Sequence, residues 1–184
     1  CGFLVENRAN KILIDGLFTD GLGKYDAPDE ATIDLMKTAS SPFDDIDYIF
    51  VTHIHSDHFD AGLILTHLKN NPAGKVICPQ QVFDELQKNG KAFSDVESRI
   101  IEITPQPQKA ITKKAGDLQF TACRISHEGF GNRHIENIGY LIDLGGYQIF
   151  HSGDGSVKKI DDFQAIDLSK MNIDLAFLFE DFGI

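Results

Sequence analysis

The sequence is short of cysteine and of basic residues, and it has no long apolar run. Its three cysteines, Cys1, Cys78 and Cys123, are odd in number and far apart, so they predict no disulfide framework. Cys78 and Cys123 lie in apolar, strand-like runs and are expected to be small buried side chains. No apolar run approaches the roughly 20 residues that cross a bilayer. We therefore expect a soluble chain without a membrane span.

Basic residues are outnumbered by acidic ones. The 17 Lys and Arg residues against 28 Asp and Glu residues give a formal net charge of −11. Such a charge repels nucleic acid and anionic membrane surfaces. No basic run is longer than the pairs Lys113-Lys114 and Lys158-Lys159. We therefore expect a small-molecule substrate rather than a nucleic-acid partner, while the oligomeric state stays open.

The length and composition suit one globular domain with a substantial core. The 184 residues are 42% hydrophobic and 24% charged, and no internal repeat or low-complexity tract divides them. The chain does not begin with methionine and opens directly in an apolar run. The unpaired cysteines favour a cytoplasmic location, and a secreted or periplasmic one stays open because a leader could precede Cys1.

Strand-like and helix-like segments are interleaved along the chain. Short apolar runs predict strands at residues 2–5, 11–15, 47–52, 75–79, 98–104, 117–126, 137–144, 147–153 and 173–179. Helical periodicity predicts helices at residues 29–39, 61–71 and 80–90, and a partly helical segment at 157–172. Gly145-Gly146 predicts a hairpin turn between two of the strands. This order predicts an α/β domain with mixed sheets flanked by helices.

Three of the seven histidines lie within six positions, in the segment His53-Ile54-His55-Ser56-Asp57-His58. His53 and His55 are two positions apart, so an extended backbone points both imidazoles to the same side, where one metal ion could bind them. Asp57 and His58 follow where the chain turns into a helix, and they could face a second ion. The alternative is a polar turn in which Asp57 caps the helix, but this explains none of the histidines.

The segment "HIHSDH" resembles the His-x-His-x-Asp-His motif of the metallo-β-lactamase fold hydrolases. "KILIDG" resembles an early strand of that family, which here ends in Asp15, and "FHSGD" resembles its later strand, which ends in Asp154. "RISHEGF" places His127 near the position of the family's third histidine. The resemblance implies an αββα sandwich of two mixed sheets flanked by helices. Residues 1–184 would form a single such domain that lacks its first strand and its C-terminal segment.

The resemblance also implies two divalent metal ions, most simply zinc, with manganese, iron or nickel as alternatives. It assigns six ligands: His53, His55, Asp57, His58, His127 and Asp154. The histidines at 53, 55 and 127 would share one ion, and Asp154 would bridge to the other. The remaining two residues would bind the second ion.

Two further positions follow from the same resemblance. Asp15 would orient a metal ligand, although a turn-capping role competes with this interpretation. The family supplies one more histidine to the second ion from a later strand, and no histidine follows His151 in this sequence. We therefore expect that ligand beyond Ile184, and the alternative is that this chain has lost it.

Several of these assignments have plausible rivals. Asp154 lies in "GDGS", which is an ordinary turn sequence. His134 lies in the same loop as His127, and we prefer His127 because it directly follows an apolar strand. We expect His151 to be a hydrogen-bonded or outer-sphere histidine, and His67 to have a surface or packing role.

The Gly-rich segment at residues 16–28 predicts an irregular loop near the site, because it follows Asp15. Phe18 and Tyr25 could wall a pocket or simply pack within the loop. Lys24 and Arg133 are the nearest basic candidates for holding an anionic substrate, but the alternative that they are ordinary surface cations is favoured, because such residues are common.

These residues predict a metal-dependent hydrolase that acts on an ester, lactone, amide or phosphodiester. Water would be activated between the two ions, and Asp57 would accept or relay its proton. His55 stands where oxygen-reducing diiron members have a carboxylate, so the resemblance implies hydrolysis rather than redox chemistry. The opening "KILIDGLF" is most similar to the branch of ascorbate-phosphate lactonase-like and uncharacterised zinc-dependent hydrolases. The alternative is a non-catalytic metal-binding or interaction module with an incomplete second metal site.

Overall fold

The computed structural model describes residues 2–179 and divides into two compact units, Cys1–Glu102 and Ile103–Ile184. We call them the N-terminal unit and the C-terminal unit. Cys1 and the chain end from residue 180 lie outside the described residues. Each unit contains one five-stranded mixed sheet with helices.

The sheet of the N-terminal unit has the strand order β1-β2-β3-β4-β5. Its strands are β1 (Phe3–Glu6), β2 (Lys11–Ile14), β3 (Tyr48–Phe50), β4 (Lys75–Cys78) and β5 (Ile100–Glu102). Strands β1 and β2 form an antiparallel pair, and β2 to β5 run parallel. The helices are α1 (Glu30–Thr38), α2 (Ala61–Asn70), α3 (Gln80–Gln87) and α4 (Lys91–Ser94), followed by the 3₁₀ helix η1 (Glu97–Arg99).

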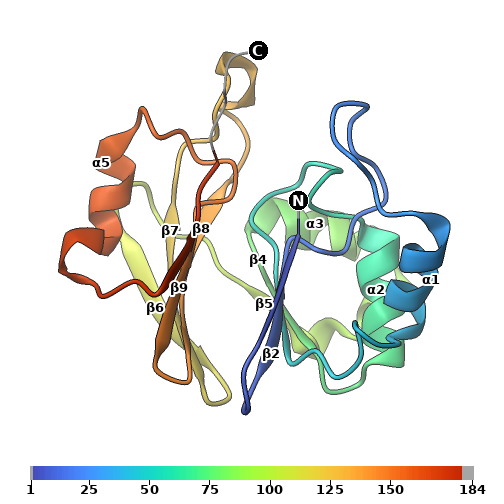
Figure 1. Cartoon of the computed structure of the whole chain (residues 1–184). Helices are drawn as coiled ribbons and strands as arrows, with labels where there is room; N and C mark the ends of the chain where they lie inside the picture. Colours follow the sequence, from blue (N-terminus) through green and yellow to red (C-terminus); the bar gives the residue numbers. More distant parts are fainter. Residues whose placement is uncertain (1, 180–184) are drawn as a thin grey trace. The chain divides into compact units, whose positions relative to one another are not determined.

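One face of this sheet packs against the helices. Leu13, Ile49 and Val76 come from the same face of adjacent strands, and they share a buried cluster with Ile64 and Leu68 of α2. Met36 of α1 and Val82 of α3 belong to the same cluster, and Figure 1 shows these helices on that side of the sheet. The apolar side chains at helical spacing therefore fix how α2 lies across the strands.

Helix α2 has side-chain partners at both ends. The Asp60 carboxylate accepts a hydrogen bond from the Leu63 N–H at 2.8 Å and so caps the N-terminus. At the other end, the Arg99 guanidinium donates to the carbonyl oxygens of Leu68, Asn71 and Gly74 at 2.7, 2.9 and 3.0 Å. Arg99 therefore satisfies carbonyl groups that a helix end leaves without partners.

The parallel pairing of β2 and β3 brings two predicted site segments to one sheet edge. Ile14 at the end of β2 is in register with Phe50 at the end of β3. The residues that follow, Asp15 and the segment from Val51 to His53, therefore leave the sheet on the same side. Ligand sites in parallel sheets form beyond such carboxyl ends.

The sheet of the C-terminal unit has the order β10-β9-β8-β7-β6. Its strands are β6 (Ala110–Ala115), β7 (Leu118–Arg124), β8 (Ile138–Leu144), β9 (Tyr147–His151) and β10 (Leu175–Phe177). All neighbours are antiparallel except β9 and β10. The short helices are η2 (Phe130–Asn132), α5 (Ile160–Phe163), η3 (Gln164–Ile166) and η4 (Leu168–Lys170).

The helical segment after β9 covers this sheet through apolar contacts. Cys123, Leu141 and Phe150 from three adjacent strands form a buried cluster with Ile166 of η3, and Phe163 of α5 packs on it. The Phe150 and Phe163 rings lie edge to face, with centroids 6.2 Å apart. The segment at residues 157–172 is thus helical in short turns, which agrees with the partly helical prediction.

The turn and strand predictions have mixed outcomes. The Gly145-Gly146 hairpin is confirmed: both glycines have positive φ, and they join the antiparallel strands β8 and β9. Strand β6, with the sequence "AITKKA", was not predicted. Strand β6 is at the sheet edge with Lys113 and Lys114 exposed, so its apolar signal is weak. The two mixed sheets with helices confirm the predicted fold class.

Among the described residues, the structure contains no helix with the length and apolar character needed to cross a bilayer.

Candidate metal centre

Five candidate residues lie at the carboxyl end of β2 and β3 in the N-terminal unit. We call this group the N-terminal cluster: Asp15, His53, His55, Asp57 and His58. Asp15 directly follows β2, and the other four follow β3 in the turn that leads to α2. Asp15, His53, Asp57 and His58 are almost fully buried. Buried polar groups of this kind need partners, and their contacts show what each side chain does.

The Asp15 carboxylate organises the cluster. It accepts hydrogen bonds from the Thr52 backbone N–H at 2.7 Å and from the Thr52 hydroxyl at 2.6 Å. It also accepts from His58 Nδ1 at 2.9 Å. Asp15 has a positive φ of 51°, which is unusual for a residue other than glycine and is typical of functional positions. Its carboxylate thus fixes His58, as an orienting residue would.

Thr52 connects Asp15 to His53 through hydrogen bonds. Because the Thr52 hydroxyl donates its proton to Asp15, its oxygen can accept from His53 Nδ1, which lies 2.9 Å away. The neutral His53 ring therefore carries its lone pair on Nε2. The same reasoning holds for His58, whose Nδ1–H donates to Asp15 and whose lone pair is on Nε2. Metal-binding histidines commonly have one ring nitrogen held in this way.

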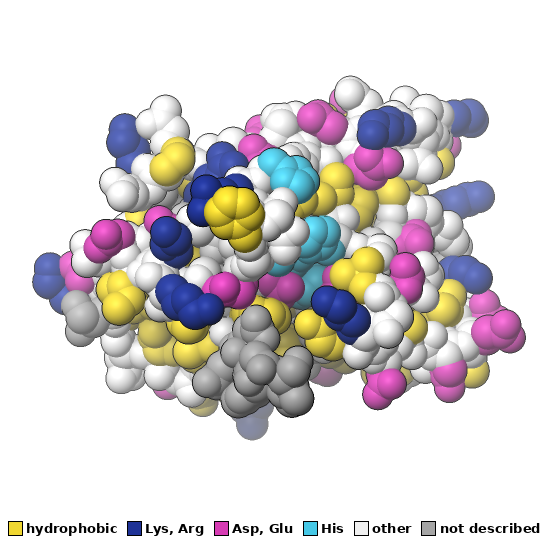
Figure 2. All heavy atoms as spheres, turned by 90° about the horizontal axis from the view of Figure 1, so that it is seen from above, with side chains coloured by type: hydrophobic (Ala, Val, Ile, Leu, Met, Phe, Trp, Pro, Cys, Tyr) yellow, Lys and Arg dark blue, Asp and Glu magenta, His cyan; other side chains and the backbone are white. Residues whose placement is uncertain are grey.

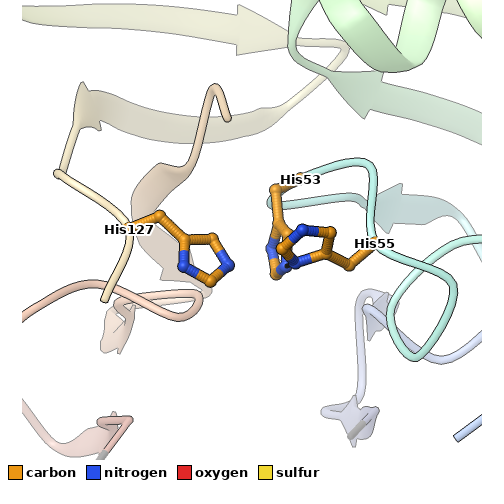
Figure 3. A group of neighbouring side chains, drawn as sticks. All are labelled: His53, His55 and His127. Carbon is orange, nitrogen blue, oxygen red and sulfur yellow. Dashed lines mark hydrogen bonds between the residues drawn. The ribbon is translucent and has the colours of Figure 1, made fainter. Parts of the chain in front are cut away.

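The spacing of His53 and His55 matches that of two ligands on one ion. His53 Nε2 lies 3.1 Å from His55 Nδ1, and the two rings meet edge to face (Figure 3). Two nitrogen ligands at about 2.0–2.1 Å from a tetrahedral zinc ion are themselves roughly 3.3 Å apart. A cation can therefore take the place of the proton that otherwise joins these two nitrogens.

Asp57 is not the N-cap of the following helix. Asp60 provides the N-cap of α2, so the predicted alternative role of Asp57 as the cap is wrong. Asp57 Oδ2 instead lies 3.6 Å from His58 Nε2. A nitrogen and a carboxylate oxygen at this separation can also share one ion.

Two more candidates, His127 and Asp154, lie together in the C-terminal unit, and we call them the C-terminal pair. His127 follows β7 and Asp154 follows β9, and these strands run in the same direction on either side of β8. His127 forms an isolated bridge with Gly155, and its Nε2 lies 3.8 Å from Asp154 Oδ2. His127 Nδ1 lies 2.7 Å from the Glu128 carbonyl oxygen, which can only accept. The Asn132 amide nitrogen lies farther from Nδ1, at 3.3 Å, and donates to the same carbonyl at 3.0 Å, so the shorter contact assigns the proton to Nδ1 and the lone pair to Nε2, as in His53 and His58.

Asn137 holds the two loops of the C-terminal pair in place. Its amide Nδ2 donates to the carbonyl oxygens of Ile125 at 3.2 Å and Ser152 at 3.0 Å, and its Oδ1 accepts from the Asp154 N–H at 3.0 Å. Asn137 is fully buried. The sequence did not reveal the roles of Asn137 and Thr52, which are the first and the last residue of two predicted strands, because neither lies in a recognisable motif.

The remaining histidines are in other environments. His134, the rival of His127, is exposed. His151 is buried, and its Nδ1 accepts the Gly153 N–H at 2.9 Å. His67 is fully buried in α2, and its Nδ1 donates to the Met36 carbonyl oxygen at 2.7 Å. The expected packing role of His67 and hydrogen-bonded role of His151 agree with these contacts.

The loop at residues 16–28 contacts the segment that carries the N-terminal cluster, as predicted. The Thr19 hydroxyl donates to Asp60 at 2.8 Å, and the Ser56 hydroxyl donates to Asp20 at 3.2 Å. Phe18 is buried in the loop, whereas Tyr25 and Lys24 are exposed.

The two described cysteines are not part of the candidate site. Cys78 and Cys123 are free and buried, as predicted. Burial raises the pKa of the Cys78 thiol, and it raises the pKa of Cys123 to about 12. Both thiols are therefore protonated near neutral pH, in a state that neither binds metal nor attacks a substrate.

Comparisons with known proteins agree with the fold. Residues 10–178 match the family described as the Beta-lactamase superfamily domain. A proposed Rieske 2Fe-2S iron–sulfur protein from Mycolicibacterium smegmatis is 27% identical over 121 residues, which are 64% of this chain and 21% of that protein. A proposed metal-dependent hydrolase from Parabacteroides distasonis has a TM-score of 0.61 at 16% identity, over 98% of this chain and 66% of that one. CmlA, a diiron β-hydroxylase from Streptomyces venezuelae, has a TM-score of 0.58 at 16% identity, over 95% of this chain and 32% of that one.

The chain thus spans about a fifth of its curated relative, about two thirds of the first solved structure and about a third of the second. At these identities, the likeness to the solved structures shows the fold alone. The family model, in contrast, covers most of the chain. The chain therefore belongs to the family of Beta-lactamase superfamily domains.

Proposed function

We propose that the chain is a metal-dependent hydrolase in which the N-terminal cluster and the C-terminal pair together hold two divalent cations. The first cation would take His53, His55 and His127. The second would take Asp57 and His58, with Asp154 shared between the two. Each of these ligands is contributed by a loop that directly follows a strand or by the turn after it.

One observation carries this proposal. His53, His58 and His127 each have Nδ1 directed to an oxygen atom, of Thr52, Asp15 and the Glu128 backbone respectively. All three rings, when neutral, therefore keep the lone pair on Nε2. A single buried histidine can reach this state by chance, but the repeated pattern is typical of imidazoles prepared to bind metal.

The donor set restricts the metals that fit. Imidazole nitrogens and carboxylate oxygens suit zinc, iron, manganese and nickel, whereas thiolate-preferring sites would need the cysteines that lie elsewhere. We propose zinc as the resident metal, because the 3.1 Å spacing of His53 Nε2 and His55 Nδ1 is close to the tetrahedral value.

The chain's own residues would support hydrolysis as follows. When bound, two divalent cations polarise the scissile carbonyl or phosphoryl oxygen and lower the pKa of water, so that hydroxide is available near neutral pH. Asp57 would accept the proton that this water releases, since its buried carboxylate lies beside His58 Nε2. Asp15 and Thr52 would keep the histidines in place during this transfer. The substrates that fit this chemistry are esters, lactones, amides and phosphodiesters.

The proposal is tested by metal-dependent hydrolysis. The purified chain, freed of metal and then loaded with zinc, manganese, iron or nickel, would be assayed on an aryl ester, a lactone, an amide and a phosphodiester. We expect at least one substrate class to be hydrolysed, with activity lost on chelation and restored by metal. Asp57→Asn should lower kcat roughly 100-fold or more, because it removes the proton acceptor.

Asp29→Asn is the matched control, because Asp29 is an exposed cap of α1 and asparagine caps as well as aspartate. It should leave kcat unchanged. Metal binding without hydrolysis of any substrate would instead support the non-catalytic module. A chain that binds none of the four metals would contradict both the hydrolase proposal and the non-catalytic metal-binding module.

A further inference from the structure

A cavity of about 570 Å³ lies in the C-terminal unit beside His127. Its walls come from the loop between β7 and β8 and from the segment after β9. The volume lies within the range of small-molecule sites. Because His127 lines the cavity, a molecule bound there would contact the side chain that we propose as a metal ligand.

The cavity is rich in positive charge, although the whole chain has a net charge of −11. Four cationic side chains line it: Arg124, Arg133, Lys158 and Lys159. On the face drawn in Figure 2, several Lys and Arg side chains (dark blue) lie close together. Among the described residues that line the cavity, Glu128 is the one acidic residue, so the lining carries more positive than negative charge, although Asp161 and Asp162 lie beside Lys159 in a neighbouring pocket.

Two of the four cations already have acidic partners. Lys158 Nζ lies 3.3 Å from Glu128, and Arg124 lies 3.8 Å from Glu136. The ion pair with Glu128 thus balances the charge of Lys158.

Arg133 and Lys159 are the two remaining cationic side chains of the cavity, and they could bind a ligand. Within residues 2–179, neither side chain pairs with a carboxylate. The Arg133 guanidinium lies over the Phe130 ring, 4.2 Å from its centroid, and this ring is 83% exposed. Stacking restricts the guanidinium while its in-plane N–H groups stay available, which is the arrangement that suits a carboxylate or phosphate.

We propose that this cavity binds an anionic group of the substrate, a carboxylate or a phosphate, through Arg133 and Lys159. This inference rests on the proposed function and narrows its substrate class to molecules with an anionic group near the scissile bond. Arg133 would supply paired N–H donors, and Lys159 would supply a second positive charge from a separate segment.

The test measures binding directly. Inorganic phosphate, glutarate and the neutral dimethyl glutarate would be titrated into the zinc-loaded protein by calorimetry. We expect phosphate or glutarate to bind and the diester not to bind, and the tighter anion identifies the preferred group. Arg133→Gln and Lys159→Gln should each raise the Kd of that anion about tenfold or more. Lys113→Gln, an equal charge change on the exposed edge strand β6, should leave it unchanged.

The outcomes separate this proposal from the hydrolase proposal. If the anion binds equally well to the wild type and to both variants, zinc alone holds it and the cavity proposal is wrong. Absence of anion binding to the wild type also overturns the proposal. A tenfold weakening without hydrolysis of any ester supports the cavity while contradicting the hydrolase. Arg133 and Lys159 lie on separate segments. If one of the two variants misfolds, the anion Kd of the other variant still tests the proposal.

In the activity arm, a 4-nitrophenyl ester of glutarate would be compared with its methyl-capped analogue. We expect Arg133→Gln to lower kcat/KM for the anionic ester about tenfold and to leave the neutral ester unaffected. An equal loss on both esters would mean that Arg133 acts on the fold of its loop and binds no anion.

Discussion

Asp15 is the residue on which the geometry of the N-terminal cluster depends most. Its carboxylate accepts from the Thr52 N–H, the Thr52 hydroxyl and His58 Nδ1. In Asp15→Asn, the amide NH₂ must face one of these donors, and the negative charge that holds His58 is lost. We expect the zinc Kd to rise roughly 10- to 100-fold, measured by competition with a chromophoric chelator.

Asp29→Asn again serves as the control and should not change the zinc Kd. An Asp15→Asn protein with unaltered zinc affinity would show that Asp15 positions no ligand.

His67 provides a pH-dependent contribution to stability. Burial lowers the pKa of His67 below 6.5, and the hydrogen bond to the Met36 carbonyl opposes this less strongly. The unfolded chain therefore binds more protons below pH 6.5 than the folded chain does. Stability from neutral His67 is complete above pH 6.5 and is lost as the pH falls toward the lower, folded-state pKa. The slope is at most about 1.4 kcal/mol per pH unit.

The measurement is the free energy of urea unfolding at pH 7.5, 6.5 and 5.5, with a chelator present to remove metal effects. His67→Gln should be less stable at pH 7.5 but should lose less on acidification than the wild type. His134→Gln, which changes an exposed histidine, should follow the wild type. Parallel curves for the wild type and His67→Gln would contradict a depressed pKa.

At the residue scale, the sequence predicted the candidate ligands but not the residues that hold them in place. The close spacing of His53, His55 and His58 predicts a metal site, because polar and titratable side chains are costly to bury without partners. Thr52 and Asn137 each act through several hydrogen bonds, and most of their partners are distant in the chain. No local pattern encodes such bonds, so they emerge only from the folded structure.

At the scale of elements, Arg99 joins η1 to the C-terminal end of α2. It donates to three carbonyl oxygens, and burial lowers its pKa while leaving it charged at neutral pH. Arg99→Met leaves these acceptors without the guanidinium. We expect the free energy of unfolding to fall by about 2–3 kcal/mol, with Arg99→Lys intermediate because it can reach fewer oxygens.

Chemical denaturation measures this effect. Arg8→Met, at an exposed position of the turn between β1 and β2, should change stability by less than about 0.5 kcal/mol. A similar small change in Arg99→Met would mean that water replaces the guanidinium without cost.

Asn137 has a corresponding role between the loops after β7 and β9. Asn137→Ala removes two donors and one acceptor from buried backbone groups. We expect a loss of about 2–3 kcal/mol in unfolding free energy and a weaker zinc affinity, because His127 and Asp154 are no longer held together.

The comparison variant is Ile142→Val on β8, which should cost about 0.5–1.5 kcal/mol without changing zinc affinity. If both variants shift zinc affinity in proportion to their stability, Asn137 is merely structural.

The elements themselves were largely predictable. Strands such as β4 and β8 are continuous apolar runs, and α1 and α2 have clear caps and apolar faces. Strand β6 was missed because an edge strand with exposed lysines has no apolar face to reveal it. The predicted helix at residues 80–90 ends at Gln87, and α4 begins after Gly90, whose positive φ interrupts the helical path.

At the scale of the whole molecule, the charge distribution complements the proposed chemistry. A net charge of −11 disfavours polyanionic partners such as nucleic acid. The cationic cavity of the C-terminal unit is a local exception to that field. Composition could predict the overall charge, but it could not predict that Arg133 and Lys159 line one cavity, because this depends on how two loops fold together.

The central proposal is that His53 and His127 bind the same cation. The most direct test is a zinc titration of the metal-free wild type, His53→Ala, His127→Ala and the double variant. A shared ion predicts that each single change weakens the same binding event beyond about 100-fold, and that the double variant adds little more. Fully additive effects, or unchanged zinc binding in His127→Ala, would show that the two residues do not hold one ion.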